Sequence, residues 1–294
     1  MNGGATGFRL QRFRDRKGGA LARQGLSHDL RSAAISPRRN AQEREVPKTA
    51  IVIPCYNEAR RLDSAGFLEF LANNPDVGFL FVDDGSSDET ERVLSDLVSR
   101  ASERASVLAL ECNQGKAEAV RRGIVKALES GPRYVGFWDA DLSTPLEVVP
   151  RFVDQLDANP GIELVMGARV QLLGRQIDRS PLRHYLGRLA ATATSTALGL
   201  RVYDTQCGAK LFRADTARML FRAPFRSRWI FDVEIIARLV ASRAGSSNRP
   251  ASEVIWEYPL NRWRDVDGSK VRPRDYIRAL FELRRIRRDY PRPG

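Results

Sequence analysis

Two aspartates separated by one residue are the clearest candidates for chemistry in this sequence. Asp139 and Asp141 directly follow the apolar run 134–138. Two carboxylates can give Mg²⁺ or Mn²⁺ oxygen ligands, and a diphosphate can supply others. Such a cation would neutralise the charge that develops on a departing diphosphate. Alternate residues of an extended strand point to opposite faces, so a tight turn must bring both carboxylates to one site.

Two polar turns earlier in the chain also follow apolar runs. The turn Pro54-Cys55-Tyr56-Asn57-Glu58 offers a ring that can stack on a base, with polar side chains that can contact a base or ribose. The turn Asp83-Asp84-Gly85-Ser86 offers carboxylates that can accept ribose or base hydrogen bonds. Each turn can also be explained by capping and turn formation alone, since Asp-Gly is a common turn pair.

A fourth turn, Asn113-Gln114-Gly115-Lys116, opens a predicted helix. Gly115 allows close approach to the backbone, the helix N-terminus favours anions, and Lys116 adds positive charge. The glycine spacing is not that of a P-loop. Four such turns in order, each after an apolar run, are difficult to explain by capping alone.

Strand and helix patterns alternate from residue 49 onward, which predicts an α/β fold. A mainly parallel sheet flanked by helices is expected, because the apolar runs are nearly continuous. Ligands bind outside the carboxyl ends of such strands. The predicted strands are 49–54, 79–82, 107–110, 134–138, 163–166, 206–212 and 253–260. The predicted helices are 60–73, 87–104, 115–129, 146–158, 181–200, 231–242 and 274–288.

The charge of the chain is concentrated at its two ends. The net charge of +12 divides into +7 for residues 1–49, −1 for 50–261 and +6 for 262–294. A neutral body disfavours nucleic acid as a partner, whereas basic ends fit an anionic membrane surface. We expect a basic, disordered leader (1–48), one α/β domain (49–289) and a short tail (290–294).

Contact with a membrane is also suggested by two predicted helices. Helix 181–200 has an apolar stripe with Arg183 and Arg188 beside it, and helix 274–288 carries several arginines. Basic amphipathic helices can lie in a lipid interface. No apolar run approaches the roughly 20 residues that span a bilayer. The three cysteines lack zinc spacing. We therefore expect a cytoplasmic protein at the inner face of a membrane.

The order P-x-Y-N-E, D-D-G-S-x-D, N-x-G-K, D-A-D resembles the family-2 glycosyltransferases of the GT-A fold over residues 49–169. Within that family the chain is similar to the dolichyl-phosphate β-glucosyltransferases and their bacterial relatives. The narrower likeness is carried by Gly167-Ala168-Arg169, by D-T-Q-C-G-A-K-L-F at 204–212, by W-I-F-D-V-E at 229–234 and by Gly268-Ser269-Lys270.

The resemblance implies an inverting, metal-dependent hexosyltransferase that moves glucose from UDP-glucose to a polyprenyl or dolichyl phosphate. Asp139 and Asp141 would bind Mg²⁺ or Mn²⁺, and Asp232 and Asp141 would be catalytic. The implied donor-binding residues are Pro54, Tyr56, Asn57, Glu58, Asp83, Asp84, Gly115, Lys116 and Asp139. The implied acceptor or phosphate residues are Arg169, Gln206, Lys210 and Lys270.

Several alternatives stay open at this stage. Residues 142–145, which follow the D-A-D motif, resemble the mannosyl enzymes, so GDP-mannose is an alternative donor. A hydroxyl acceptor would need a general base, for which Asp232 is the candidate, whereas a phosphate acceptor needs cationic clamps more than a base. A nucleotidyltransferase would want a glycine-rich basic loop after the first strand. An inactive binding module would not need Asp139, Asp141 and Lys116.

Overall fold

A computed structural model of the chain describes residues 47–178, 181–244, 249–264 and 273–290. The described residues all belong to one compact unit, Glu45–Gly294. Its strands are β1 (Thr49–Cys55), β2 (Val77–Asp83), β3 (Ala105–Ala109), β4 (Tyr134–Trp138), β5 (Leu164–Ala168), β6 (Gln176–Asp178), β7 (Ala209–Arg213), β8 (Ile255–Pro259) and β9 (Arg262–Arg264). The α-helices are α1 (Ser64–Asn73), α2 (Thr90–Arg100), α3 (Lys116–Leu128), α4 (Val148–Ala158), α5 (Pro181–Leu198), α6 (Ala214–Phe221), α7 (Phe231–Ala241), α8 (Ala251–Val254) and α9 (Pro273–Asp289).

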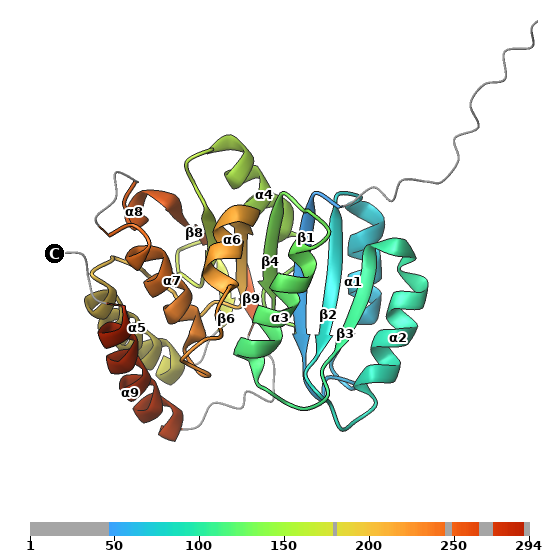
Figure 1. Cartoon of the computed structure of the whole chain (residues 1–294), viewed down its shortest axis with the longest axis horizontal. Coiled ribbons are helices and arrows are strands. Elements are labelled where there is room, and N and C mark those ends of the chain that lie inside the picture. The colour runs from blue at the N-terminus through green and yellow to red at the C-terminus, as the bar shows by residue number, and fades with distance from the viewer. Residues whose placement is uncertain (1–46, 179–180, 245–248, 265–272, 291–294) are drawn as a thin grey trace, which may run out of the picture. The chain divides into compact units, whose positions relative to one another are not determined.

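Seven strands form the central sheet, in the order β3-β2-β1-β4-β7-β5-β8 (Figure 1). Strand β7 runs antiparallel to both of its neighbours, and the other strand pairs are parallel. The predicted mainly parallel α/β sheet is therefore confirmed. A small parallel ribbon of β6 and β9 lies apart from it.

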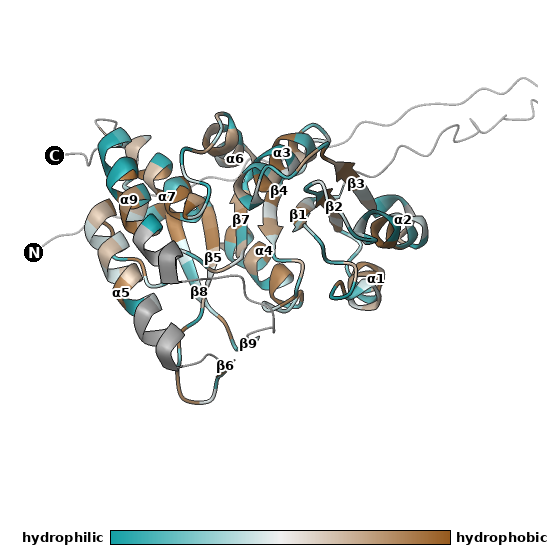
Figure 2. Ribbon diagram, turned by 90° about the horizontal axis from the view of Figure 1, so that it is seen from below, coloured by the Kyte–Doolittle hydropathy of each residue, from teal (hydrophilic) through white to brown (hydrophobic). Residues whose placement is uncertain are grey.

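Helices cover both faces of this sheet, as Figure 2 shows. On one face Val52 and Phe137 pack with α3, α6 and α7. On the other face Ile53 and Trp138 pack with α1, α2 and α4. Successive strand residues therefore enter opposite cores, which explains why the strand sequences are continuously apolar. The N-terminal ends of the helices and the turns before them remain at the sheet edge, where ligands bind.

The structure shifts several predicted boundaries. The predicted strand 253–260 begins as the short helix α8, and only Ile255–Pro259 is strand. Helix α1 begins at Ser64 rather than at residue 60, because the Asp63 carboxylate accepts a hydrogen bond from Gly66 N at 3.0 Å and caps the helix there. Helix α6 and the ribbon of β6 and β9 were not predicted.

The apolar stripe predicted on helix 181–200 is only partly correct. Leu189, one of the apolar residues of that stripe, is 69% exposed, while Thr194 and Leu198 are buried. Ser195 Oγ accepts a hydrogen bond from Val202 N and donates one to Val202 O, so the helix turns polar groups toward the segment that follows it. Among the described residues, no helix is long and apolar enough to cross a membrane.

Candidate active site

The Asp139–Asp141 pair lies at the carboxyl end of β4, where a tight turn begins. Leu142 N donates to Asp139 O at 3.3 Å, and Leu142 takes a left-handed conformation with φ of 52°. Ser143 N in turn donates to Asp141 Oδ1 at 3.0 Å. The turn that the sequence requires is therefore present, and it redirects the chain directly after Asp139.

Asp139 is held in place by the neighbouring strand β7. Asp139 N donates to Gly208 O at 2.9 Å, just before β7 begins. A Cβ atom on residue 208 would lie only 1.9 Å from Asp139 Oδ2. Gly208 is therefore needed for space, because any side chain would occupy the position of the Asp139 carboxylate. The sequence alone did not indicate this role.

Asp139 Oδ1 is a buried oxygen that lies beside the Lys116 ammonium. The Lys116 ammonium lies 2.5 Å away as an ion pair. Within the described residues this ion pair is the close contact of Oδ1, and it contributes to the raised pKa of Lys116. A buried carboxylate oxygen is costly unless protein groups or a ligand complete it. Asp139 Oδ1 is therefore an oxygen that a bound cation could use as a ligand.

Three carboxylates surround the Lys116 ammonium. Burial by itself lowers the pKa of Lys116, but Asp139, Asp232 and Asp141 together raise that pKa above its ordinary value. All three acids therefore lie within electrostatic reach of one ammonium group. The helix N-terminus at Lys116 adds positive potential at the same place.

These residues fit a hard divalent cation. Within the described part of the chain there is no group of three His, Cys, Asp or Glu side chains that could hold a metal ion. Two aspartates are therefore the available protein ligands, and oxygens from a diphosphate or from water would complete the shell. The buried Oδ1 of Asp139 is a suitable ligand atom for such an ion.

Lys210, which was expected to face a phosphate, lies inside the fold. Its side chain is completely buried, and its ammonium donates to Asp232 Oδ1 at 2.5 Å and to Cys207 O at 2.7 Å. An ammonium enclosed in this way cannot also clamp a phosphate at the surface. Lys210 instead fixes the direction of the Asp232 carboxylate, which lies in the first turn of α7. Asp232 itself is 7% exposed, and its negative charge helps to raise the pKa of Lys116.

The carboxylates of Asp83 and Asp84 join the turns to one another. Both Asp84 oxygens accept backbone hydrogen bonds at 2.8 Å, from Gln114 N and Gly115 N. Asp83 Oδ1 accepts from Ser86 N and Ser86 Oγ. Desolvation by burial raises the pKa of Asp84, although the two amides oppose that rise. Asp84 therefore ties the end of β2 to the turn before α3, and each of its oxygens accepts one of these backbone hydrogen bonds.

The turn after β1 presents an aromatic ring beside these groups. Tyr56 is 37% exposed, whereas Pro54 is still part of strand β1. Asn57 has a left-handed φ of 53°, and its Oδ1 accepts from Ser87 N at 2.9 Å. Glu58 forms an ion pair with Arg61 at 2.6 Å. Of this set, Tyr56 keeps the surface that a stacked base requires.

Arg228 is a further cation at this edge that the sequence analysis did not select. Its guanidinium donates to Gln114 O at 3.0 Å and lies over Gly115, which has a φ of 92°. A cavity of about 360 Å³ opens here, lined by Asn113, Gln114, Ala117, Glu118, Phe225, Ser227 and Arg228. The only sequence signal was its position one residue before the W-I-F-D-V-E string.

On the acceptor side, Arg169 and Asp204 form a two-point ion pair, with nitrogen–oxygen distances of 2.6 and 2.8 Å. Asp204 also accepts from Gln206 N, and Glu257 accepts from Tyr203 N and Asp204 N. Burial lowers the pKa of Arg169, but Asp204 more than offsets this and keeps the guanidinium charged. Arg169 therefore holds the 203–206 loop through Asp204, using Nε and one of its two terminal nitrogens.

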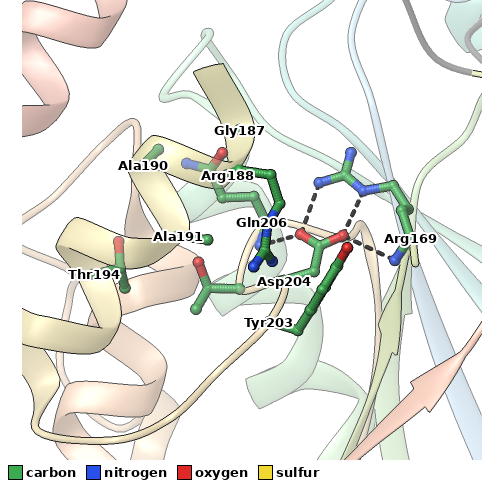
Figure 3. A pocket seen from close by; sticks show the side chains of 10 residues that line it. Arg169, Gly187, Arg188, Ala190, Ala191, Thr194, Tyr203, Asp204 and Gln206 are labelled. Atoms are coloured by element: carbon green, nitrogen blue, oxygen red, sulfur yellow. Dashed lines mark hydrogen bonds and ion pairs between the residues drawn. The ribbon is translucent and has the colours of Figure 1, made fainter. Parts of the chain in front are cut away.

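A small cavity of about 30 Å³ lies between that loop and α5 (Figure 3). Arg188 lines it and stacks over the Tyr203 ring at 4.0 Å. Arg169 and Gln206 line it as well, so two of the predicted acceptor residues are at the cavity. The sequence analysis named Arg188 only for membrane contact. Lys270 lies outside the described residues.

Comparisons with known proteins agree with this arrangement. The family model described as Glycosyl transferase family 2 matches residues 50–229. A dolichyl-phosphate β-glucosyltransferase of Dictyostelium discoideum is 32% identical over 82% of this chain and 74% of its own length. A protein of the same name from Drosophila melanogaster is 34% identical over 76% of this chain and 69% of its own.

Solved structures show the same fold at lower identity. Glucosyl-3-phosphoglycerate synthase of Mycobacterium tuberculosis, in complex with Mn²⁺, uridine diphosphate and glucosyl-3-phosphoglycerate, aligns with a TM-score of 0.55 and 22% identity. The alignment covers 80% of this chain and 79% of that one.

Proposed function

The chain belongs to glycosyl transferase family 2, and from that premise we propose that it transfers glucose from UDP-glucose to a polyprenyl phosphate, with inversion at the anomeric carbon. The relatives that carry the name dolichyl-phosphate β-glucosyltransferase support both the sugar and the acceptor class. The observation that carries the proposal is the buried Asp139 oxygen beside Asp141 and Lys116 at the carboxyl end of β4.

The donor half, 49–169, would hold the nucleoside diphosphate. The Tyr56 ring would stack on the base, and the turn at Gly115 would approach the diphosphate through its backbone. Asp139 and Asp141 would hold Mg²⁺ or Mn²⁺. When bound, that ion would neutralise the charge of the leaving diphosphate. Lys116 would leave its ion pair with Asp139 and turn toward the diphosphate oxygens.

The acceptor half, 170–289, would bind the lipid phosphate beside the 203–206 loop. Arg188 and Gln206 line the cavity there, and Arg169 fixes the loop through Asp204. A phosphate oxygen would attack the anomeric carbon directly. The new carbon–oxygen bond forms as the bond to the diphosphate breaks, and UDP leaves with the electron pair. A phosphate already ionised at neutral pH needs no base, so Asp232, fixed by Lys210, would orient Lys116 and the reacting groups.

Transfer of mannose from GDP-mannose is the second candidate, and the turn 142–145 is the observation that favours it. Sugar epimers differ by one hydroxyl direction, and a few hydrogen bonds decide between them. We place the enzyme peripherally at the cytoplasmic face of a membrane, where a lipid-linked acceptor is available.

A screen of donors and acceptors tests the proposal. Purified protein with Mn²⁺ meets UDP-glucose, GDP-mannose and UDP-N-acetylglucosamine, with and without a short-chain polyprenyl phosphate. An Asp141→Asn variant and an EDTA arm serve as controls. Turnover of UDP-glucose that requires the lipid phosphate and disappears in both controls supports the proposal. Turnover that ignores the lipid phosphate removes the acceptor assignment, and no turnover with any donor removes the proposal itself.

A further inference from the structure

The last helix, α9, exposes a face on which apolar and basic side chains are mixed. Leu280 is 58% and Phe281 is 67% exposed. Four exposed arginines follow these two residues. With 3.6 residues per turn, the two apolar residues and the four arginines lie within roughly half of the helix circumference. We name this surface the outer face of α9; its residues are Leu280, Phe281, Arg284, Arg285, Arg287 and Arg288.

The opposite side of α9 fixes the helix to the rest of the domain. Ile286 is buried, and Leu283 packs against the same core. Glu282 Oε2 accepts hydrogen bonds from Trp229 N at 3.2 Å and Ile230 N at 3.3 Å. These residues lead directly into Asp232. The helix cannot rotate to bury Leu280 and Phe281 without breaking these contacts, so its outer face is available to a partner.

The basic charge of this face is largely uncompensated. Arg288 pairs with Asp289 at 3.1 Å. No ion pair within the described residues involves Arg284, Arg285 or Arg287. Arginines that have no acidic neighbour beside exposed aromatic and aliphatic side chains are the composition of helices that lie in an anionic lipid interface. The apolar side chains enter the acyl boundary, and the guanidinium groups reach the lipid phosphates.

We propose that the outer face of α9 is the surface by which this protein docks on an anionic lipid bilayer. The proposal deepens the proposed function, which requires an acceptor held in a membrane, but it rests on the side chains of α9 alone. A second copy of the chain is a poorer occupant, because two such faces would bring eight arginines together.

Sedimentation with vesicles tests the docking surface without any sugar donor. The full chain is mixed with phosphatidylcholine vesicles that contain either no phosphatidylglycerol or 30 mol% of it, and the partition coefficient is measured at low and high salt. We expect clear binding to the anionic vesicles and a fall with salt. Replacing Arg284 and Arg287 by Gln should weaken binding about 25-fold, at about fivefold for each charge near the surface. Replacing Leu280 and Phe281 together by Ser should weaken binding by a similar factor, because more than half of each side chain is exposed in the free protein and would be buried in the lipid.

Matched variants elsewhere on the surface are the controls. Met219→Ser on α6 with Val125→Ser on α3 removes two exposed apolar side chains, and Arg92→Gln with Arg100→Gln on α2 removes two charges. Both control pairs should bind like the wild type. Equal losses in control and α9 variants, binding unchanged in the α9 variants, or no preference for anionic vesicles would each overturn the proposal. So would a wild-type dimer, by light scattering, that the α9 variants convert to monomer.

A second readout separates this proposal from the proposed function. The α9 variants should transfer sugar to a short, water-soluble polyprenyl phosphate at the wild-type rate, and more slowly to a long-chain acceptor in vesicles. If the wild type binds anionic vesicles through α9 but transfers no sugar, the proposed function fails and the docking surface stands. If it transfers sugar but the α9 variants bind vesicles normally, only the docking surface fails.

Discussion

Replacing Gly208 by alanine should remove activity while it leaves the fold intact. The new methyl group would lie 1.9 Å from Asp139 Oδ2 and 2.2 Å from its Cγ. Because the obstructed atoms belong to the end of a side chain, the carboxylate can rotate away without displacing β4 or β7. It must move by more than about 1 Å, and a misplacement of this size in an active site costs about 100-fold in rate.

The assay is kcat/KM for the donor identified by the screen, with Mn²⁺ affinity measured separately by electron paramagnetic resonance. We expect a drop of about 100-fold, or about 2.7 kcal/mol of transition-state stabilisation, together with weaker Mn²⁺ binding. Gly78→Ala in β2 is the control. Its new methyl group would lie 2.9 Å from the Pro47 side chain, away from the candidate site residues. A folded Gly208→Ala protein with kcat/KM within threefold of the wild type would refute the reasoning.

Three further predictions concern other buried charges and the thiols. Lys116→Met should tighten Mn²⁺ binding in the absence of donor, because the Asp139 oxygen loses its ion pair. The same change should raise KM for the donor about tenfold, as expected for the loss of a charged hydrogen bond. Unchanged Mn²⁺ binding in electron paramagnetic resonance titrations would contradict this prediction. Lys210→Met should lower the free energy of unfolding by about 3–5 kcal/mol in urea titrations, because Asp232 stays buried without its partner. A loss below about 1 kcal/mol would show instead that the pair is open to water. Burial raises the pKa of Cys207 to about 11 and also raises the pKa of Cys55, so both thiols stay protonated at pH 8. Iodoacetamide should therefore label only the exposed Cys112 in the native protein, and all three thiols in urea.

The sheet and the place of the site were readable from the sequence because both depend on local patterns. Continuous apolar runs that end in polar turns predict parallel strands with their ligand edge at those turns. The turns at Tyr56, Asp83, Lys116 and Asp139 were found in this way. The structure places all four after β1, β2, β3 and β4, in the order in which the sequence has them.

The contacts that the sequence did not reveal have a different physical origin, which is pairing between residues far apart in the chain. Lys210 reads as an exposed cation until β7 buries it against Asp232, 22 residues away. Arg169 reads as a phosphate clamp until Asp204 takes its guanidinium. The role of Gly208 depends on the pairing of β4 with β7, which no local pattern specifies. The burial of Thr194 and the hydrogen bonds of Ser195 to Val202 in α5 likewise depend on the segment that follows the helix, which an apolar pattern does not reveal.

The most direct test of the account is a calorimetric titration of the protein with UDP, with Mn²⁺ and then in EDTA, beside an Asp139→Asn variant. The central claim is that Asp139 and Asp141 bind a nucleoside diphosphate through a divalent cation. It predicts one UDP site per chain with Mn²⁺, and at least tenfold weaker binding in EDTA and in the variant. Equal UDP affinity under all three conditions, or no UDP binding by the wild type, would contradict it.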